Sequence, residues 1–131
     1  MIFDHIGIFV HSIPLGRKFF EKTLTIKKKS KIIKDDNLRV KIQFLYDKKN
    51  IRYELISGLG KNNPVDNTLN KNVNIINHIA YRTNKFEKII KSMKAQGNLQ
   101  ISQPKNAKAF RNKKVVFFLT KLGFIIELIE E

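Results

Sequence analysis

The chain has 131 residues, of which 42% are hydrophobic and 28% charged, the composition of one globular domain that folds in water. No apolar run approaches the roughly 20 residues that span a bilayer, and the opening sequence MIFDHIGIFV has neither the basic leader nor the cleavage site of a secretory signal. We therefore expect no membrane segment and a cytoplasmic location. The chain has no cysteine, so any metal ion must bind to His, Asp, Glu or Gln.

The formal net charge of +15 would attract nucleic acid, an anionic membrane or an anionic small molecule. However, 21 of the 26 basic residues are Lys and only 5 are Arg, and Lys is accompanied by many Ile and Asn residues, as in A/T-rich coding sequences. Base and phosphate recognition favours Arg, and the chain contains no zinc-finger spacing, basic zipper region or RNA-binding aromatic motif. The composition thus argues against dedicated nucleic-acid binding and fits an anionic small-molecule substrate.

The first half of the chain predicts a strand, a helix and three further strands. Residues 2–10 are apolar and β-branched, as in a buried strand. Ser12 as the N-cap and Pro14 in the first turn begin a helix that extends to about residue 24. The buried side of this helix is expected to carry Leu15, Phe19, Phe20 and Leu24. The remaining strands are expected at 26–34, 39–46 and 51–57, with a hairpin turn over 47–50.

The second half predicts the same succession after a polar linker over 58–73, in which 64–69 form a short helical turn. A strand over 74–83 comes first. The next helix begins with a capping pair, Asn84 and Glu87, and ends at Gly97. Its apolar residues have helical spacing: Phe86, Ile89, Ile90 and Met93. The last strands are expected at 99–103, 113–119 and 124–130, with a hairpin turn over 120–123.

A shift of the sequence by 73 residues superposes the two halves. His5 then falls on His78 and Glu54 on Glu127, so each half has a His and a Glu 49 residues apart. The strand pairs that precede each Glu superpose without a gap. The chain is therefore interpreted as two copies of one module within a single domain. The two copies are 1–57 and 74–131.

The repeated His and Glu residues are candidate metal ligands. Both carboxylates lie in apolar strand sequences, where an unpaired buried charge costs several kcal/mol, and Glu54 shares a strand face with Arg52. Two His and two Glu in paired modules would converge about a pseudo-twofold axis, and this donor set suits Zn, Ni, Co, Mn or Fe(II). A structural histidine and an edge-strand glutamate are the alternatives, but the equal spacing in both copies favours a shared metal site. His11 has no counterpart and is assigned no chemistry.

Segments along nearly the whole chain match, in order and spacing, the pattern of one known family. FDHIGIFVHSI with RKFFEKTL matches its opening strand and helix, and RYELISGL with NNPVDNTL matches its fourth strand and linker. NHIAYRTNKFEKIIKSMKAQG matches the start of its second module, and the final strand pair ends in IEL. In these respects the chain resembles the vicinal oxygen chelate (glyoxalase/bleomycin-resistance) superfamily, and within it the methylmalonyl-CoA epimerase-like proteins.

The resemblance implies an α+β fold of two paired βαβββ modules that form a cupped, eight-stranded mixed sheet with the helices outside. It assigns the divalent metal ligands to His5, Glu54, His78 and Glu127. In the epimerase, the metal polarises a thioester carbonyl, so that a base can remove the adjacent α-proton and an acid can return it on the other face. Glu127 corresponds to one proton carrier. The other aligns with Asp35, Asp36 or Asn37, depending on where one residue is gapped.

One loop departs from the epimerase pattern. AKAFRN, residues 107–112, replaces a Gly-Ala-His-Gly stretch and has Arg111 in place of the His. We interpret Phe110 as a pocket wall and Arg111 as a clamp for a carboxylate or phosphate, against the alternatives of an aromatic packed on its own hairpin and a solvated Arg. The positive charge of the chain agrees with a substrate that is a CoA thioester or carries a carboxylate.

The leading functional hypothesis is a metal-dependent isomerase or epimerase that acts on an acyl thioester or carboxylated substrate with an acidic α-proton. Two alternatives share the fold: a glyoxalase I-like lyase, which uses the same four-ligand pattern on a glutathione hemithioacetal, and a non-catalytic ligand-binding or resistance protein. Turnover of a glutathione adduct would indicate the lyase, and absence of bound metal would favour the binding protein. An extradiol dioxygenase is disfavoured because the ligands are divided evenly between the modules. A small homodimer is compatible with the sequence.

Overall fold

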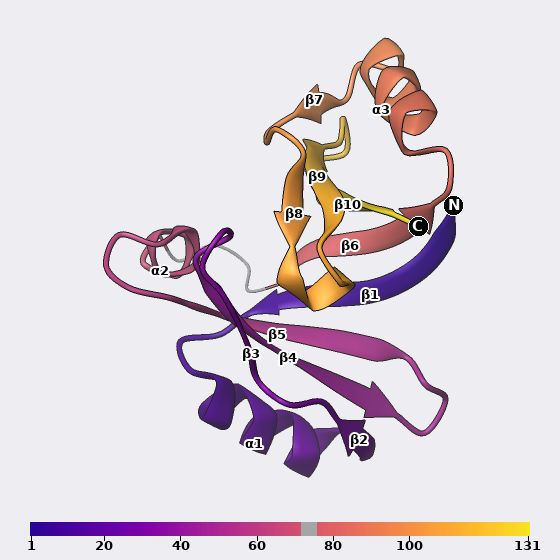
Figure 1. The fold of residues 1–131 in the computed structure, drawn as a ribbon. Coiled ribbons are helices and arrows are strands. Elements are labelled where there is room, and N and C mark those ends of the chain that lie inside the picture. The colour runs from indigo at the N-terminus through magenta and orange to yellow at the C-terminus, as the bar shows by residue number, and fades with distance from the viewer. Residues whose placement is uncertain (72–75) are drawn as a thin grey trace. The chain divides into compact units, whose positions relative to one another are not determined.

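The computed structural model describes residues 1–71 and 76–131 (Figure 1). These residues contain ten strands and three α-helices, and the chain divides into two compact units. The first unit is His5–Asn77, and the second unit is Met1–Asp4 together with His78–Glu131. Strand β1 (Ile2–Phe9) therefore begins in the second unit and continues into the first.

The first unit combines a mixed sheet with one long helix. Its further strands are β2 (Ile26–Lys29), β3 (Ile33–Asp35), β4 (Val40–Asp47) and β5 (Arg52–Gly58), and its helices are α1 (Ile13–Thr23) and α2 (Pro64–Leu69). The strand order is β2–β4–β5–β1, with β3 also paired to β4. Strand β5 runs parallel to β1 and antiparallel to β4, which is the arrangement expected of a βαβββ module.

The second unit repeats this topology. Its strands are β6 (Ile76–Thr83), β7 (Leu99–Gln100), β8 (Lys105–Ala107), β9 (Lys113–Leu119) and β10 (Ile125–Glu130), and its helix is α3 (Phe86–Ala95). The order is β6–β10–β9–β7, with β8 paired to β9. Strand β10 runs parallel to β6 and antiparallel to β9. The predicted α+β fold of two βαβββ modules is confirmed. Two predicted boundaries, the end of the linker at 72–73 and the start of the following strand at 74–75, lie outside the described residues.

The number of strands differs from the prediction. Eight strands were expected, and ten are present in the part of the chain that the structure describes. The strand expected over 26–34 is divided into β2 and β3, and the one expected over 99–103 is shorter and is followed by β8. Each break contains a serine, Ser30 or Ser102, whose hydroxyl accepts a backbone N–H of the neighbouring strand. In a regular β-sheet, a backbone carbonyl oxygen of the neighbouring strand, not a hydroxyl, accepts the hydrogen bond from such an N–H.

Of the four residues predicted to form the buried side of helix α1, Phe20 is buried, whereas Leu15, Phe19 and Leu24 are exposed. Leu15 and Phe19 are 69% and 63% exposed. The buried residues of the helix are Ile13 and Phe20. Gly16 provides the physical reason, because a Cβ at this position would lie 2.8 Å from a side-chain carbon of Val10. The missing side chain lets the helix approach the strand closely along the Gly16 side and leaves the Leu15–Phe19 side in solvent.

The two long helices begin differently. Ser12 caps α1 as predicted, through a 3.3 Å hydrogen bond from a backbone N–H of the first turn to its Oγ. For α3 the predicted capping pair of Asn84 and Glu87 is wrong, because Lys85 occupies the cap position and makes no side-chain cap hydrogen bond. The Thr83 hydroxyl accepts the Lys85 N–H at 3.1 Å. This bond forms the turn after β6, so the helix begins one residue later than expected.

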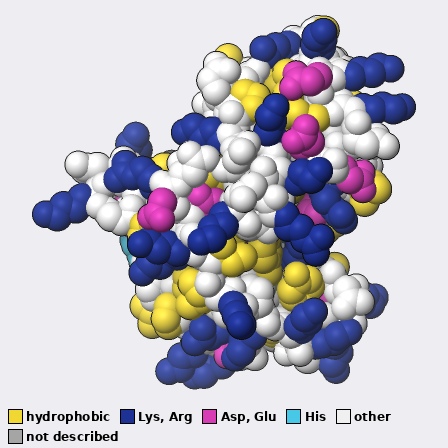
Figure 2. Space-filling model, viewed as in Figure 1, with side chains coloured by type: hydrophobic (Ala, Val, Ile, Leu, Met, Phe, Trp, Pro, Cys, Tyr) yellow, Lys and Arg dark blue, Asp and Glu magenta, His cyan; other side chains and the backbone are white. Residues whose placement is uncertain are grey.

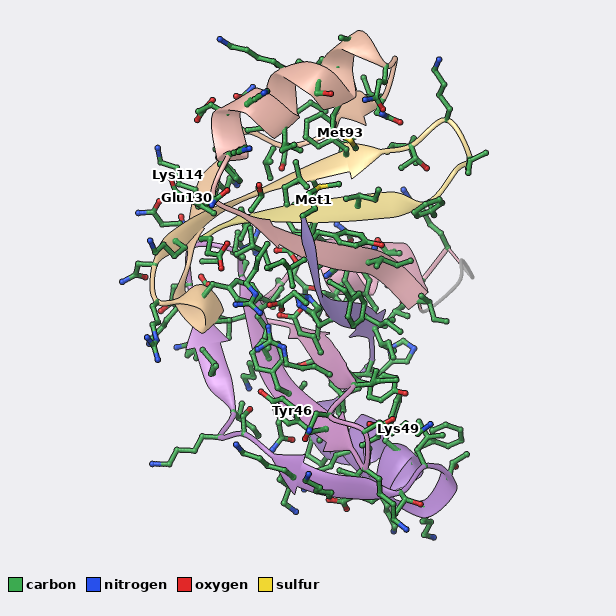
Figure 3. The ribbon with its side chains drawn as sticks, turned by 90° about the vertical axis from the view of Figure 1, so that its right-hand side faces the viewer. Met1, Tyr46, Lys49, Met93, Lys114 and Glu130 are labelled. Atoms are coloured by element: carbon green, nitrogen blue, oxygen red, sulfur yellow. The ribbon has the colours of Figure 1, made fainter. Side chains whose placement is uncertain are left out.

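Each unit has its own hydrophobic core between a helix and one face of the strands. The first-unit core contains Ile8, Ile13, Phe20, Leu45 and Leu55. The second-unit core contains Phe86, Ile90, Met93, Val116, Phe118 and Leu128. After the 73-residue shift, Ile13 falls on Phe86, Phe20 on Met93, Leu45 on Phe118 and Leu55 on Leu128. Met93 extends from α3 toward the strands (Figure 3). The sequence repeat is therefore a repeat of the buried packing.

The basic side chains do not form one concentrated patch on the face that Figure 2 shows. Lys and Arg are spread over this face, with hydrophobic and acidic side chains between them (Figure 2). Among the residues that the structure describes, every helix is too short or too polar to cross a membrane.

Candidate metal centre

The first unit brings His5 and Glu54 together on one face of its sheet. Strands β1 and β5 are parallel, with Gly7 opposite Glu54, so His5, two residues earlier on β1, lies on the same face. The neighbouring residue Leu55 points to the opposite face, into the core beneath α1. His5 Nε2 lies 3.0 Å from Glu54 Oε2, and both side chains are buried.

The second unit forms the equivalent pair from β6 and β10. These strands are also parallel, with Ile125 opposite His78. Leu128 points into the core beneath α3, so Glu127 lies on the other face. His78 Nε2 lies 3.2 Å from Glu127 Oε2, and both side chains are buried. The four predicted ligands thus form one buried His–Glu pair in each unit.

A phenylalanine ring supports each histidine. In the first unit Phe44 lies opposite Glu54 across the hairpin, and its ring meets the His5 ring edge-on, with centroids 5.9 Å apart. In the second unit Phe117 lies opposite Glu127, and its ring meets the His78 ring in the same way at 5.5 Å. The interplanar angles are 70° and 72°. The rings restrict the orientation of both imidazoles.

A serine holds the backbone of each phenylalanine. The Phe44 N–H donates to Ser30 Oγ at 3.0 Å, and the Phe117 N–H donates to Ser102 Oγ at 3.0 Å. These serines and phenylalanines were not identified as site residues from the sequence. The 73-residue shift already superposes the phenylalanines, whereas the serines are 72 residues apart and require a gap of one residue.

The donor atoms of each pair suit a divalent metal ion. Two ligands bound at about 2.1 Å with an angle of 90–110° lie roughly 3.0–3.4 Å apart, and the His–Glu separations are 3.0 and 3.2 Å. A His N–H···O hydrogen bond has a similar length, so distance alone does not distinguish a pair of metal ligands from a hydrogen-bonded pair. The burial of the two carboxylates is the property that favours a metal site. A buried carboxylate needs compensating positive charge, and imidazole nitrogen with carboxylate oxygen is a donor set that Zn, Co, Ni, Mn and Fe(II) accept. All four residues are candidate ligands.

The two predicted acidic proton carriers lie in different environments. Asp35, at the end of β3, is buried and lies opposite Val40. Val40 and Phe44 point to the same face of β4, so Asp35 shares that face with Glu54. The four residue steps from Val40 to Phe44 place Asp35 roughly 13 Å from Glu54 along the strand direction. The Asp36 side chain is 81% exposed.

The Asp35 carboxylate also organises the turn between β3 and β4. Its Oδ1 accepts hydrogen bonds from the backbone N–H groups of Asn37 and Leu38, both at 3.0 Å. Such bonds are typical of an Asx turn. An asparagine at position 35 would keep this acceptor oxygen but lose the ability to carry a proton.

The two predicted substrate-binding residues lie in the second unit, after a short 3-10 helix over Lys108–Phe110. Phe110 is partly buried and Arg111 is exposed. Arg111 has a φ of 55°, in the left-handed region, and its N–H donates to the Lys108 carbonyl at 3.3 Å. Its backbone therefore belongs to a turn, while its guanidinium extends into solvent.

A known protein family matches most of the chain. The model described as the Glyoxalase/Bleomycin resistance protein/Dioxygenase superfamily matches residues 4–117. This range contains His5, Glu54 and His78 and ends before Glu127. No curated protein matches the chain.

Solved structures with the same fold extend over almost the whole chain. A hypothetical protein from Bacillus halodurans C-125 is 28% identical, with a TM-score of 0.84, over 98% of this chain and 93% of that chain. Methylmalonyl-CoA epimerase from Mycobacterium tuberculosis is 20% identical, with a TM-score of 0.81, over 98% and 86%. A Streptomyces coelicolor methylmalonyl-CoA epimerase variant in complex with 2-nitronate-propionyl-CoA is 18% identical, with a TM-score of 0.81, over 100% and 97%.

Proposed function

Because the chain belongs to the Glyoxalase/Bleomycin resistance protein/Dioxygenase superfamily, we propose that it is a metal-dependent isomerase that epimerises its substrate at the carbon beside a carbonyl group. The observation that carries this proposal is the duplicated buried His–Glu pair. The fold shared with two methylmalonyl-CoA epimerases supports an isomerase rather than another reaction of the superfamily. The substrate class is an acyl thioester or another carboxylated, anionic small molecule.

In this proposal the two pairs supply the four ligands of one divalent metal ion. The ligands are His5, Glu54, His78 and Glu127. When bound, the ion would polarise the substrate carbonyl and make the adjacent α-proton more acidic. The two glutamates balance the charge of a divalent ion, and the rings of Phe44 and Phe117 hold both imidazoles in one orientation.

The chain's own carboxylates would carry the proton. The Glu127 carboxylate removes the α-proton from one face of the substrate, and a second acid returns a proton to the other face. Asp35 takes the second role in preference to Asp36, because Asp35 is buried on the face that carries Glu54 whereas Asp36 is exposed. Phe110 and Arg111 would contact the substrate, with the exposed guanidinium binding an anionic group.

The test begins with the metal content of protein purified without chelator or affinity metal. Elemental analysis of the wild type is expected to find about one divalent ion per chain, and His5→Ala and Glu127→Ala are expected to lose it. Metal-loaded protein is then mixed with methylmalonyl-CoA in D₂O, and proton NMR follows loss of the α-proton signal. Exchange that the wild type catalyses and both variants lack supports the proposal.

Other outcomes distinguish the alternative functions. Metal binding without α-proton exchange, together with turnover of the methylglyoxal–glutathione hemithioacetal, would assign a glyoxalase I-like lyase. Failure to bind Co, Ni, Mn or Zn after reconstitution would contradict the enzyme proposal and leave a ligand-binding protein of the same fold.

A further inference from the structure

The strand breaks at Ser30 and Ser102 lie beside the phenylalanines that contact the histidines. In the first unit the Ser30 N–H donates to the Phe44 carbonyl at 2.9 Å, as in a regular antiparallel pair. The return bond, from the Phe44 N–H, goes to Ser30 Oγ at 3.0 Å instead of the Ser30 carbonyl. The displaced carbonyl needs another donor, because a backbone polar group that is buried without a partner is costly.

A glutamine side chain supplies that donor in each unit. Gln43 Nε2 donates to the Ser30 carbonyl at 2.8 Å. Gln100 Nε2 donates to the Ser102 carbonyl at 2.7 Å. In the first unit Arg17 Nη1 also donates to Gln43 Oε1 at 3.2 Å, and because a guanidinium can only donate, this bond fixes which end of the amide faces the serine. Each serine is therefore held at its hydroxyl by a phenylalanine N–H and at its carbonyl by a glutamine amide.

The two glutamines are not equivalent in the sequence repeat. The 73-residue shift superposes Gln43 on Val116. The same shift superposes Gln100 on Lys27. Gln43 lies on β4, the strand of the phenylalanine, whereas Gln100 lies on β7, the strand that precedes the serine. Duplication of one module therefore does not explain why both units make the same bond, and a common requirement at the serine carbonyl does.

Both glutamines lie on the face opposite to the candidate ligands. Gln43 adjoins Phe44 on β4, so its side chain points to the face that carries the core residue Leu45. Gln100 lies opposite Phe118, a core residue of the second unit. The amides are thus separated from the ligand face by the sheet itself. Any influence on the histidines passes through the serine and the phenylalanine.

We propose that Gln43 and Gln100 are positioning residues of the metal centre. By holding the serine carbonyl, each amide keeps the serine hydroxyl on the phenylalanine N–H. This bond places the ring that meets the imidazole edge-on. Irregular strand pairing beside a functional site re-aims a side chain in the same way. The inference rests on the proposed function and adds the residues that fix the orientation of its histidines.

The experiment measures metal affinity and stability in the same variants. Gln43→Met and Gln100→Met keep the length of the side chain and remove the amide donor. Asn98→Leu is the matched control, because Asn98 Nδ2 donates to the Met93 carbonyl at 3.1 Å, a bond of the same kind after the end of α3. Competition with a chromophoric chelator gives the Kd for cobalt, and urea denaturation of the metal-free protein gives the free energy of unfolding.

Each glutamine variant is expected to raise the cobalt Kd roughly 5- to 10-fold. Asn98→Leu should leave the Kd unchanged although it loses a comparable bond and comparable stability. Gln43→Met added to Phe44→Leu should raise the Kd no further than Phe44→Leu alone, because the amide acts through that ring.

Three results would overturn the positioning role alone: an unchanged Kd in either glutamine variant, an equal rise in Asn98→Leu, or additive effects of Gln43→Met and Phe44→Leu. A wild type that binds no cobalt would overturn the proposed function together with it.

Discussion

The first unit and the second unit contain the same arrangement of His, Glu, Phe and Ser. In the first unit these residues are His5, Glu54, Phe44 and Ser30, and in the second they are His78, Glu127, Phe117 and Ser102. The residue beside the histidine differs, with Arg52 in one unit and Ile125 in the other. The helix starts also differ, since Ser12 caps α1 whereas α3 lacks a side-chain cap bond. The two copies thus share the His–Glu pair with its Phe and Ser contacts and differ in the residue beside the histidine and in the helix cap.

If the two pairs serve one ion, removing either histidine should have the same effect. His5→Ala and His78→Ala are each expected to lose the metal and to lower α-proton exchange on the order of 10³- to 10⁴-fold, because several kcal/mol of stabilisation would be lost. Elemental analysis and NMR exchange rates measure both effects. Retention of metal by one variant only would show that the two units are not equivalent in binding.

The equivalent cores should contribute similar stability. Leu55→Ala and Leu128→Ala truncate fully buried side chains at superposed positions, and each is expected to lower the free energy of unfolding by about 2–5 kcal/mol. Urea denaturation followed by circular dichroism measures this change. Leu122→Ala, at a leucine that is 86% exposed, should change stability by less than about 0.5 kcal/mol. A loss below 1 kcal/mol for only one of the buried variants would contradict equivalent packing.

The proposed second proton carrier, Asp35, lies in the first unit, whereas Glu127 lies in the second. Substitution of Asp35 therefore tests whether the two units have different roles in proton transfer. Asp35→Asn keeps the Oδ1 acceptor of the turn and removes the titratable group. We expect α-proton exchange to fall on the order of 10²-fold with metal content and thermal stability unchanged. Asp36→Asn, at the neighbouring exposed carboxylate, should leave the rate unchanged. The role passes from Asp35 to Asp36 if these two results are reversed.

The smallest expected effect concerns the rings that support the histidines. Phe44→Leu and Phe117→Leu should each weaken metal binding by about 10-fold, because the imidazole would lose a contact that fixes its orientation. Competition with a chromophoric chelator measures the affinity. Unchanged metal affinity in both variants would contradict the role of the rings.

The repeat in the sequence was sufficient to predict both modules and the two His–Glu pairs. It works because a 73-residue shift preserves, along each strand, the alternation between residues that face the core beneath the helix and candidate ligands on the opposite face. The buried side of α1 was not predictable in the same way, since apolar residues lie on more than one side and the close approach at Gly16 decides between them. The Phe and Ser supports were missed because ring contacts and hydroxyl bonds to a neighbouring strand depend on register, which the sequence pattern alone does not specify.

Strand β1 begins in the unit to which the second half of the chain belongs. Asp4 Oδ2 lies 2.6 Å from Arg82 Nε, so an ion pair at the beginning of the chain depends on a residue 78 positions later. At typical synthesis rates of 5–20 residues per second, Asp4 waits roughly 4–16 s for this partner. The Asp4–Arg82 ion pair can therefore form only after every residue of the first unit, His5–Asn77, has been synthesised.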